Sequence, residues 1–178
     1  MHKLLGATAG GLVLAAAALL PAVAGATPVT GNSQITQNGL GSIRLGMTVD
    51  QAQRRTGQRI ENNLFTPGDI SCGIAQLFPK SLGVNMQTTN LHIWVINVSD
   101  RAIATRSGIH VGDTVSDLRR AYGSRLHSGP NKYIPKARDY WVTFPRNRKL
   151  KFFTNPGRKI TQISSGRKPE VDYVEGCA

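Results

Sequence analysis

The most regular hydrophobic pattern in the chain occurs twice. Residues 43–60 read IRLGMTVDQAQRRTGQRI, and residues 109–126 read IHVGDTVSDLRRAYGSRL. The two segments align without a gap at an offset of 66 residues, and seven of their 18 positions are identical. Because this similarity recurs at a fixed offset, it indicates a duplicated unit.

Each copy has the pattern of a short helix with defined ends. Thr48 stands three residues before Gln51, which is the spacing of a capping box, and a helix is therefore predicted over 49–56. In the second copy Val115, Leu118 and Tyr122 form one apolar stripe at helical spacing. Glycines allow a turn before each helix and a left-handed residue after it. The residues assigned to these helix ends are Gly46, Thr48, Gly57, Gly112, Thr114 and Gly123.

Strand-like segments rich in β-branched and aromatic residues follow each helix, separated by residues typical of turns. The segments expected to form strands are 71–78, 84–88, 91–98, 139–144, 150–154 and 159–164. Residues 61–70 and 127–138 contain Pro, Gly and Asn, and are expected to be loops.

These elements predict an α+β fold of two tandem repeats. Each repeat would be a short helix followed by a three-stranded antiparallel meander, with the helices packed on one sheet face. The expected boundaries are a first repeat over 39–104 and a second repeat over 105–178, which includes the C-terminal tail.

The N-terminal 26 residues have the pattern of a signal peptide. Lys3 precedes an apolar run over 12–23, and Ala24-Gly25-Ala26 supplies small residues for cleavage after Ala26. The apolar run is too short to span a bilayer, and no other segment is long enough. We therefore expect a secreted protein, with residues 27–38 as a flexible leader.

Charge and cysteine content extend this interpretation. Without Lys3 the chain has 21 Lys and Arg against 10 Asp and Glu, a formal charge of +11, which attracts anionic partners of any kind. Cys72 and Cys177 both lie in the exported part, and two cysteines in an oxidising compartment predict a disulfide. That bond would tie the tail back to the first repeat.

The string Ile43-x-Leu45-Gly46-Met47-Thr48-x-x-x-Ala52, followed by a short helix that ends in glycine, resembles the start of the SmpA/OmlA (BamE-like) domain. Two tandem copies in one secreted chain are similar to the architecture of the beta-lactamase inhibitor proteins of actinobacteria. The chain also resembles uncharacterised exported actinobacterial proteins that end in Glu-Gly-Cys. The resemblance implies a helix followed by an antiparallel sheet in each repeat, and its motif reports fold rather than activity.

The chain departs from these families in two ways. BamE-like proteins are lipoproteins, whereas no cysteine follows the apolar run here. The resemblance implies a disulfide within each inhibitor repeat, whereas here the predicted bond links the first repeat to the tail. Inhibition of a beta-lactamase is therefore a minor alternative, because no residue of an inhibitory surface can be matched.

Catalytic and metal-binding patterns are absent from the sequence. It contains no Gly-x-Ser-x-Gly, no phosphate-binding glycine-rich loop and no His-x-x-x-His. His92, His110 and His127 are scattered, and two cysteines are too few for a structural zinc site. We expect no catalytic residue, no metal and no cofactor.

Two kinds of binding stay open. Basic residues interleaved with aromatic ones in the second half are typical of polyanion-binding surfaces, for nucleic acid, wall polymer or anionic lipid. Tryptophans instead often anchor protein interfaces, although a strand tryptophan is more often core. The residues singled out for binding are Trp94, Trp141, Tyr140, Arg146, Arg148 and Lys149. The favoured function is a secreted, non-catalytic protein that binds another protein. Polyanion binding is the alternative, and a secreted enzyme comes third.

Overall fold

The computed structural model describes residues 25–173 and residue 176. Nearly all of the expected signal peptide and Cys177 lie outside the described residues, so cleavage after Ala26 and the Cys72–Cys177 disulfide stay predictions. The strands are β1 (Gln34–Thr36), β2 (Gly39–Leu40), β3 (Ile43–Arg44), β4 (Ile60–Leu64), β5 (Gly73–Leu77), β6 (Val84–Thr89), β7 (His92–Val98), β8 (Ala104–Thr105), β9 (His127–Pro130), β10 (Arg138–Phe144), β11 (Arg148–Thr154) and β12 (Ile160–Arg167). The helices are α1 (Val49–Thr56) and α2 (Val115–Tyr122), with 3-10 turns η1 (Lys80–Leu82), η2 (Gly123–Arg125) and η3 (Glu170–Asp172).

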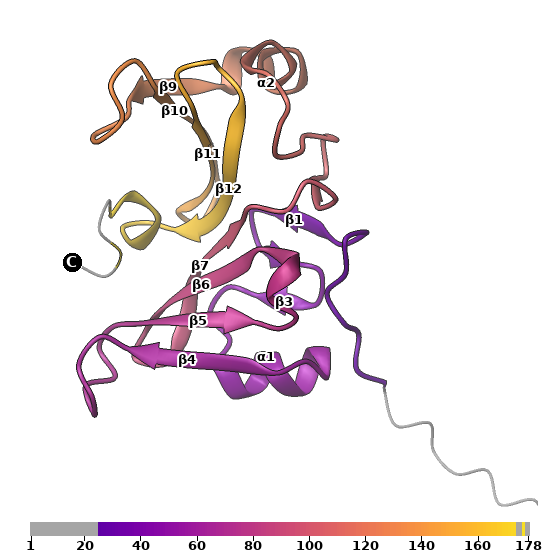
Figure 1. Ribbon diagram of the computed structural model, residues 1–178, viewed down its shortest axis with the longest axis vertical. Helices are drawn as coiled ribbons and strands as arrows, with labels where there is room; N and C mark the ends of the chain where they lie inside the picture. The colour runs from indigo at the N-terminus through magenta and orange to yellow at the C-terminus, as the bar shows by residue number, and fades with distance from the viewer. Residues whose placement is uncertain (1–24, 174–175, 177–178) are drawn as a thin grey trace, which may run out of the picture.

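One eight-stranded sheet dominates the molecule, in the order β4-β5-β6-β7-β12-β11-β10-β9 (Figure 1). All of its neighbouring strands are antiparallel. The halves join where β7 pairs with β12, with Val98 opposite Ile163. A second sheet has four short strands in the order β3-β2-β1-β8.

The predicted fold class is wrong. Strands make up 41% of the described residues and helices 17%, so the protein is mostly β. Each α-helix is followed by four strands of the large sheet instead of three, because β4 and β9 form in segments expected to be loops. The additional strands and the second sheet move the fold from α+β to mainly β.

The two halves of the large sheet nevertheless use the same backbone hydrogen bonds. The Gly46 N–H donates to the Ile93 carbonyl at 2.7 Å, and the Gly112 N–H donates to the Ile160 carbonyl at 2.8 Å. The turn before each helix is therefore held by the last strand of its own half. Because these glycines have φ angles of 92° and 99°, the turn suits a residue without a Cβ.

Both helices begin and end at the expected residues. The Thr48 hydroxyl accepts from the backbone N–H of Gln51, and the Gln51 side chain accepts from the backbone N–H of Thr48. Thr114 and Asp117 make the same reciprocal pair at the start of α2. Each pair satisfies two backbone donors that a helix start leaves free.

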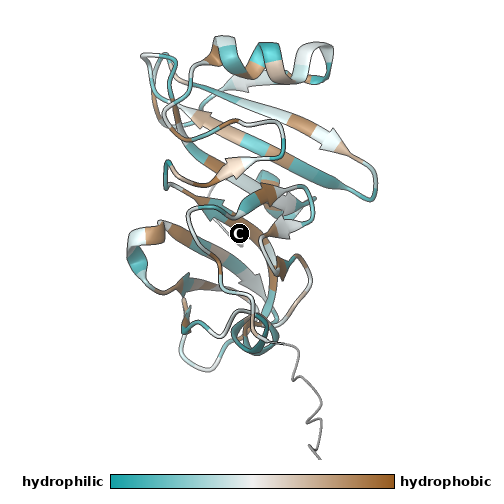
Figure 2. Ribbon diagram, turned by 90° about the vertical axis from the view of Figure 1, so that its right-hand side faces the viewer, coloured by the Kyte–Doolittle hydropathy of each residue, from teal (hydrophilic) through white to brown (hydrophobic). Residues whose placement is uncertain are grey.

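The large sheet has two different faces because successive side chains of a strand point to opposite sides. We call the face that carries Ile60, Met86, Ile96, Leu150 and Phe152 the core face, since these residues are buried in the hydrophobic core. Figure 2 shows the resulting alternation of hydrophobic and hydrophilic positions along the strands. We call the opposite face the polar face.

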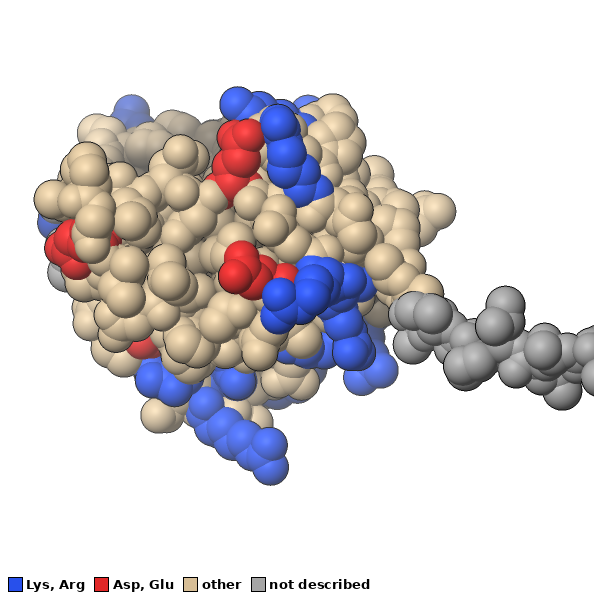
Figure 3. Space-filling view, turned by 90° about the horizontal axis from the view of Figure 1, so that it is seen from below, with Lys and Arg blue, Asp and Glu red and all other residues tan. Residues whose placement is uncertain are grey.

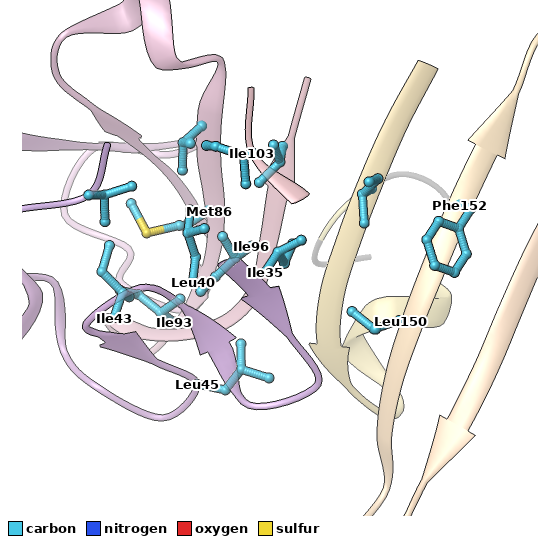
Figure 4. Packing of buried hydrophobic residues seen from close by; sticks show 14 of the residues in the cluster. Ile35, Leu40, Ile43, Leu45, Met86, Ile93, Ile96, Ile103, Leu150 and Phe152 are labelled. Carbon is cyan, nitrogen blue, oxygen red and sulfur yellow. The ribbon is translucent and has the colours of Figure 1, made fainter. Parts of the chain in front are cut away.

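The core face is covered by the helices and by the small sheet. The ring of Tyr122 in α2 lies 5.5 Å from the ring of Phe152. Residues of the small sheet, Ile35 and Leu40 among them, are fully buried and pack near Met86 and Ile96 (Figure 4).

The expected flexible leader over 27–38 is part of this packing, which corrects that prediction. β1 pairs in parallel with β8, and Val29 is buried at 1% exposure. The Thr27 N–H donates to the Arg55 carbonyl, and the Ser42 hydroxyl donates to the Thr27 carbonyl. The segment is mostly polar, but its two apolar residues Val29 and Ile35 are buried and fix it to the core.

Candidate binding face

A continuous row of side chains crosses the polar face, with one residue from each of the eight strands. The strand register places each residue directly opposite the next one in the row. Residues directly opposite in an antiparallel pair have Cβ atoms about 5 Å apart and interact. In sheet order the row is Glu61, Gln76, Asn85, Asn97, Ser164, Lys151, Trp141 and His127. We call it the central row.

Hydrogen bonds fix the middle of the central row. The Ser164 hydroxyl donates to Asn97 Oδ1 at 2.6 Å, and Asn97 Nδ2 donates to Asn85 Oδ1 at 2.9 Å. The Gln162 amide donates to both Asn97 and Ser164. Because each buried polar group here has a partner, the network holds the join between β7 and β12 without an apolar core on this side.

The β9–β11 end of the row is aromatic and basic. The ring of His127 stacks on that of Trp141, with centroids 6.1 Å apart, and Lys149 Nζ lies 5.5 Å from the Trp141 ring. Lys151 Nζ pairs with Asp139 Oδ2 at 3.2 Å. Trp141 is half-buried, so part of its ring is available to a partner.

The chain after β12 crosses the middle of the polar face. Lys149 forms an ion pair with Asp172 of η3, and Val171 packs directly over Gly166. A Cβ at Gly166 would lie 2.6 Å from Val171 Cβ, so this contact requires glycine. Beside this crossing is a cavity of about 370 Å³. Its walls include Asn97, Gln162 and Ser164 of the sheet, Asn131 and Ile134 of the 131–137 loop, and Tyr173 of the tail.

Exposed apolar side chains gather on the segments around the polar face. Phe65 and Tyr133 are 62% and 55% exposed and lie on the loops that join β4 to β5 and β9 to β10. Both loops project on the same side of the molecule in Figure 1, with η3 between them. Six of the seven large exposed hydrophobic residues of the described chain belong to this set: Phe65, Ile70, Ile74, Tyr133, Ile134 and Tyr173. Leu91 is the exception.

The structure separates the residues that the sequence singled out for binding. Trp141 and Lys149 lie together on the polar face, whereas Tyr140 is buried on the core face opposite Phe152. Arg146 is exposed in the turn between β10 and β11. Trp94 lies elsewhere in β7, where the Arg167 guanidinium is 4.2 Å above its ring.

Arg148 also points away from Lys149, because neighbouring strand residues face opposite sides. Arg148 stands directly opposite Arg167 in the register of β11 and β12. Arg167 Nη2 lies 3.8 Å from Glu170 Oε1. Burial, and then the charges of Arg167 and Arg146, lower the pKa of the Arg148 guanidinium below its ordinary value. Its Nη1 is buried without a hydrogen-bond partner among the described residues.

Sequence reasoning missed most of the central row. Asn85 and Asn97 alternate with buried apolar residues, which is a detectable sign of a strand with one polar side. Their alignment into one row depends on the register of strands from both halves, which the sequence did not indicate.

Basic side chains also gather on the first half. The face seen from below shows Lys and Arg in groups near the start of the described chain (Figure 3). A hollow of about 790 Å³ there is lined by Arg44, Arg54 and Arg55. Its wall also includes Gly25, the first described residue.

Metal-binding clusters and membrane-spanning helices are absent from residues 25–173 and 176. This part of the chain contains no group of three or more His, Cys, Asp or Glu side chains placed to hold a metal ion. It also contains no helix that is both long and apolar enough to cross a membrane.

Comparisons with known proteins show a shared fold without a function. No family model matches the sequence, and no curated protein matches it. The structure is similar to that of the uncharacterized protein yfeY from Escherichia coli, with a TM-score of 0.52 and 14% sequence identity. The similarity covers 75% of this chain and 99% of the other. At this identity it concerns the fold alone, and the resemblance to BamE-like and inhibitor repeats stays a prediction.

Proposed function

We propose that this is a secreted, non-catalytic protein that binds another protein through its polar face. The observation that carries the proposal is the distribution of exposed apolar residues, six of which lie on β5, on the two hairpin loops and on the tail beside the polar face. Scattered exposed hydrophobic residues are normal on a soluble protein, whereas their gathering marks an interaction surface. Secretion is supported by the signal-peptide pattern of the first 26 residues.

The composition of the face suits a protein partner. Aromatic anchors such as Trp141 and Tyr133 supply large contact areas at low entropic cost, and the amide and hydroxyl groups of the central row supply hydrogen bonds. An interface of this kind combines apolar anchors with a polar surround. The proposal of a non-catalytic role rests on the sequence, which offers no nucleophile with an adjacent base.

The net charge of the chain indicates the charge that a protein partner would have. Without Lys3 the chain carries a formal charge of +11, which favours a partner with an acidic surface, because long-range attraction speeds encounter with acidic partners and disfavours basic ones. The two hairpin loops lie on either side of η3, so the partner would contact both halves of the sheet at once. We therefore propose a folded acidic protein of the cell envelope or exterior.

A photo-crosslinking residue placed at single positions tests this proposal. Gln87 and Thr143 lie on the polar face, and Ser116 lies exposed on α2 as the matched control. We expect the same acidic protein to be crosslinked from positions 87 and 143, and not from position 116. Equal crosslinking from all three positions, or crosslinking from 116 alone, would contradict the proposed face.

A further inference from the structure

A further pocket lies beside α2 in the second half and is lined by four basic side chains. It has a volume of about 480 Å³ and lies between α2, β9, β10 and the turn over 155–158. The basic residues are Arg119, Lys136, Arg138 and Arg158, and no Asp or Glu is among the described residues that line it. We call it the cation pocket.

The four cations have no carboxylate partner in the described chain. Their side chains are exposed and take part in none of its ion pairs. Arg138 is held in place by a hydrogen bond from Nη2 to the Ser128 hydroxyl at 3.1 Å. Like charges gathered without counter-charges repel one another, so an anion that enters the pocket would relieve this repulsion.

The other half of the molecule provides an internal comparison. The Val49 N–H donates to the Leu91 carbonyl as the Val115 N–H donates to the Arg158 carbonyl, so Leu91 and Arg158 occupy equivalent positions. The sequence alignment of the repeats places Gln53 opposite Arg119.

The strands of the two halves also have equivalent positions. Gly73 lies opposite Thr88, as Arg138 lies opposite Thr154. Three of the four cations are thus replaced by Gln53, Gly73 and Leu91 in the first half. The fold therefore does not require the cations, and they are specific to the second half.

The first half closes the equivalent space with its own side chains. The Thr88 hydroxyl donates to Asn62 Oδ1 at 3.1 Å, and a Cβ at Gly73 would lie within 3.0 Å of both of these side chains. The second half has an open basic pocket at this place. Its chemistry is that of a site for an oxyanion, since guanidinium groups form paired, charge-assisted hydrogen bonds with phosphate oxygens.

We propose that the cation pocket binds a phosphate ester. Three arginines can share the oxygens of one phosphate group, and Lys136 adds a fourth donor from the 131–137 loop. The volume falls within the range of small-molecule sites, which leaves room for part of the group that carries the phosphate. This site is separate from the polar face and does not depend on the protein-binding function.

Titration calorimetry with inorganic phosphate, at constant ionic strength adjusted with chloride, tests the pocket. We expect binding by the unchanged chain and at least a tenfold weaker affinity for Arg119→Gln/Arg138→Gln. The control Arg55→Gln/Arg106→Gln removes the same charge from exposed positions outside the pocket and should bind normally. Arg119→Lys, which keeps the charge, should retain most of the affinity, and thermal melting should show that every variant is folded.

A second arm distinguishes the source of the phosphate. Vesicles of phosphatidylcholine with phosphatidic acid present the same group on a lipid. Vesicle binding that phosphate inhibits and the pocket variant loses supports a lipid headgroup as the source. Phosphate binding without vesicle binding supports a soluble phosphate ester. The proposal is overturned if phosphate does not bind, or if pocket and control variants weaken binding equally.

Discussion

Ser164 and Ser165 are neighbours in β12, and their hydroxyl groups lie on opposite faces of the sheet. Ser164 donates to Asn97 Oδ1 on the polar face. Ser165 is fully buried on the core face, and its hydroxyl has no hydrogen-bond partner among the described residues. A satisfied buried hydroxyl stabilises the fold, whereas an unsatisfied one costs about 1–3 kcal/mol.

The two serines therefore predict opposite effects of the same substitution. Ser165→Ala should raise the free energy of unfolding by about 1 kcal/mol, because it removes an unsatisfied polar group. Ser164→Ala should lower it by about 1 kcal/mol, because it removes a hydrogen bond of the central row. Urea denaturation at one temperature measures both values. A loss of stability in Ser165→Ala as large as in Ser164→Ala would show that Ser165 has a partner after all.

The two helix caps are equivalent in geometry but differ in chemistry. The capping box of α1 uses Gln51, which does not titrate, whereas that of α2 uses Asp117. The hydrogen bond with the Thr114 side chain, followed by that with the Thr114 backbone, lowers the pKa of Asp117 below its ordinary 3.8. A carboxyl group with a lowered pKa in the folded state contributes stability above its ordinary pKa and loses it as the pH falls through the lowered value.

Acid should consequently weaken α2 before α1. Lowering the pH from about 5 to below the ordinary carboxyl pKa should reduce hydrogen-exchange protection of the first turn of α2 and leave that of α1 unchanged. In Asp117→Gln, α2 has the same non-titrating cap as α1, so this difference should disappear. Equal loss of protection in both helices of the natural chain would argue against the capping carboxylate as its cause.

The helices were predictable because their signals are local. Thr48, Gln51 and Gly57 lie within ten residues, and the hydrogen bonds that they make are with near neighbours in the chain. The strands that were missed have no such signal. β4 reads IENNL and β9 reads HSGP, and both depend on pairing with a neighbouring strand that the chain reaches only later.

The missed strands explain why the fold class was wrong. β9 contains Gly129 and Pro130 and lies at the sheet edge, the place where proline is tolerated. The sequence pattern does not indicate β4, β9 or the short strands of the second sheet. It therefore predicts only a helix and three strands in each unit. Composition alone also could not show which of the predicted binding residues share a face, since Tyr140 and Trp141 are neighbours that face opposite sides.

At the scale of the whole molecule, the duplicated halves form one sheet with two separate candidate surfaces. The polar face crosses the join between β7 and β12, and therefore uses both halves. The cation pocket belongs to the second half alone. The backbone signals that repeat, such as Gly46 and Gly112, position the strands, while the side chains that differ between the halves carry the proposed functions.

The proposed protein interface rests on exposed apolar residues whose positions can be compared directly. Leu91 is exposed like the others but lies beside the start of α1, where its carbonyl accepts from the Val49 N–H. It is the natural control for Phe65 and Tyr133, since all three are exposed apolar side chains on connecting segments.

The affinity for the crosslinked partner is the most direct measure of the central claim. Phe65→Ala/Tyr133→Ala should raise the dissociation constant at least tenfold, because anchors on both halves are lost. A tenfold change corresponds to a loss of about 1.4 kcal/mol of binding free energy. Leu91→Asn should leave it unchanged, since asparagine accepts the positive φ of 63° at that position. Unchanged affinity in the double variant, or an equal loss in Leu91→Asn, would contradict binding through the polar face.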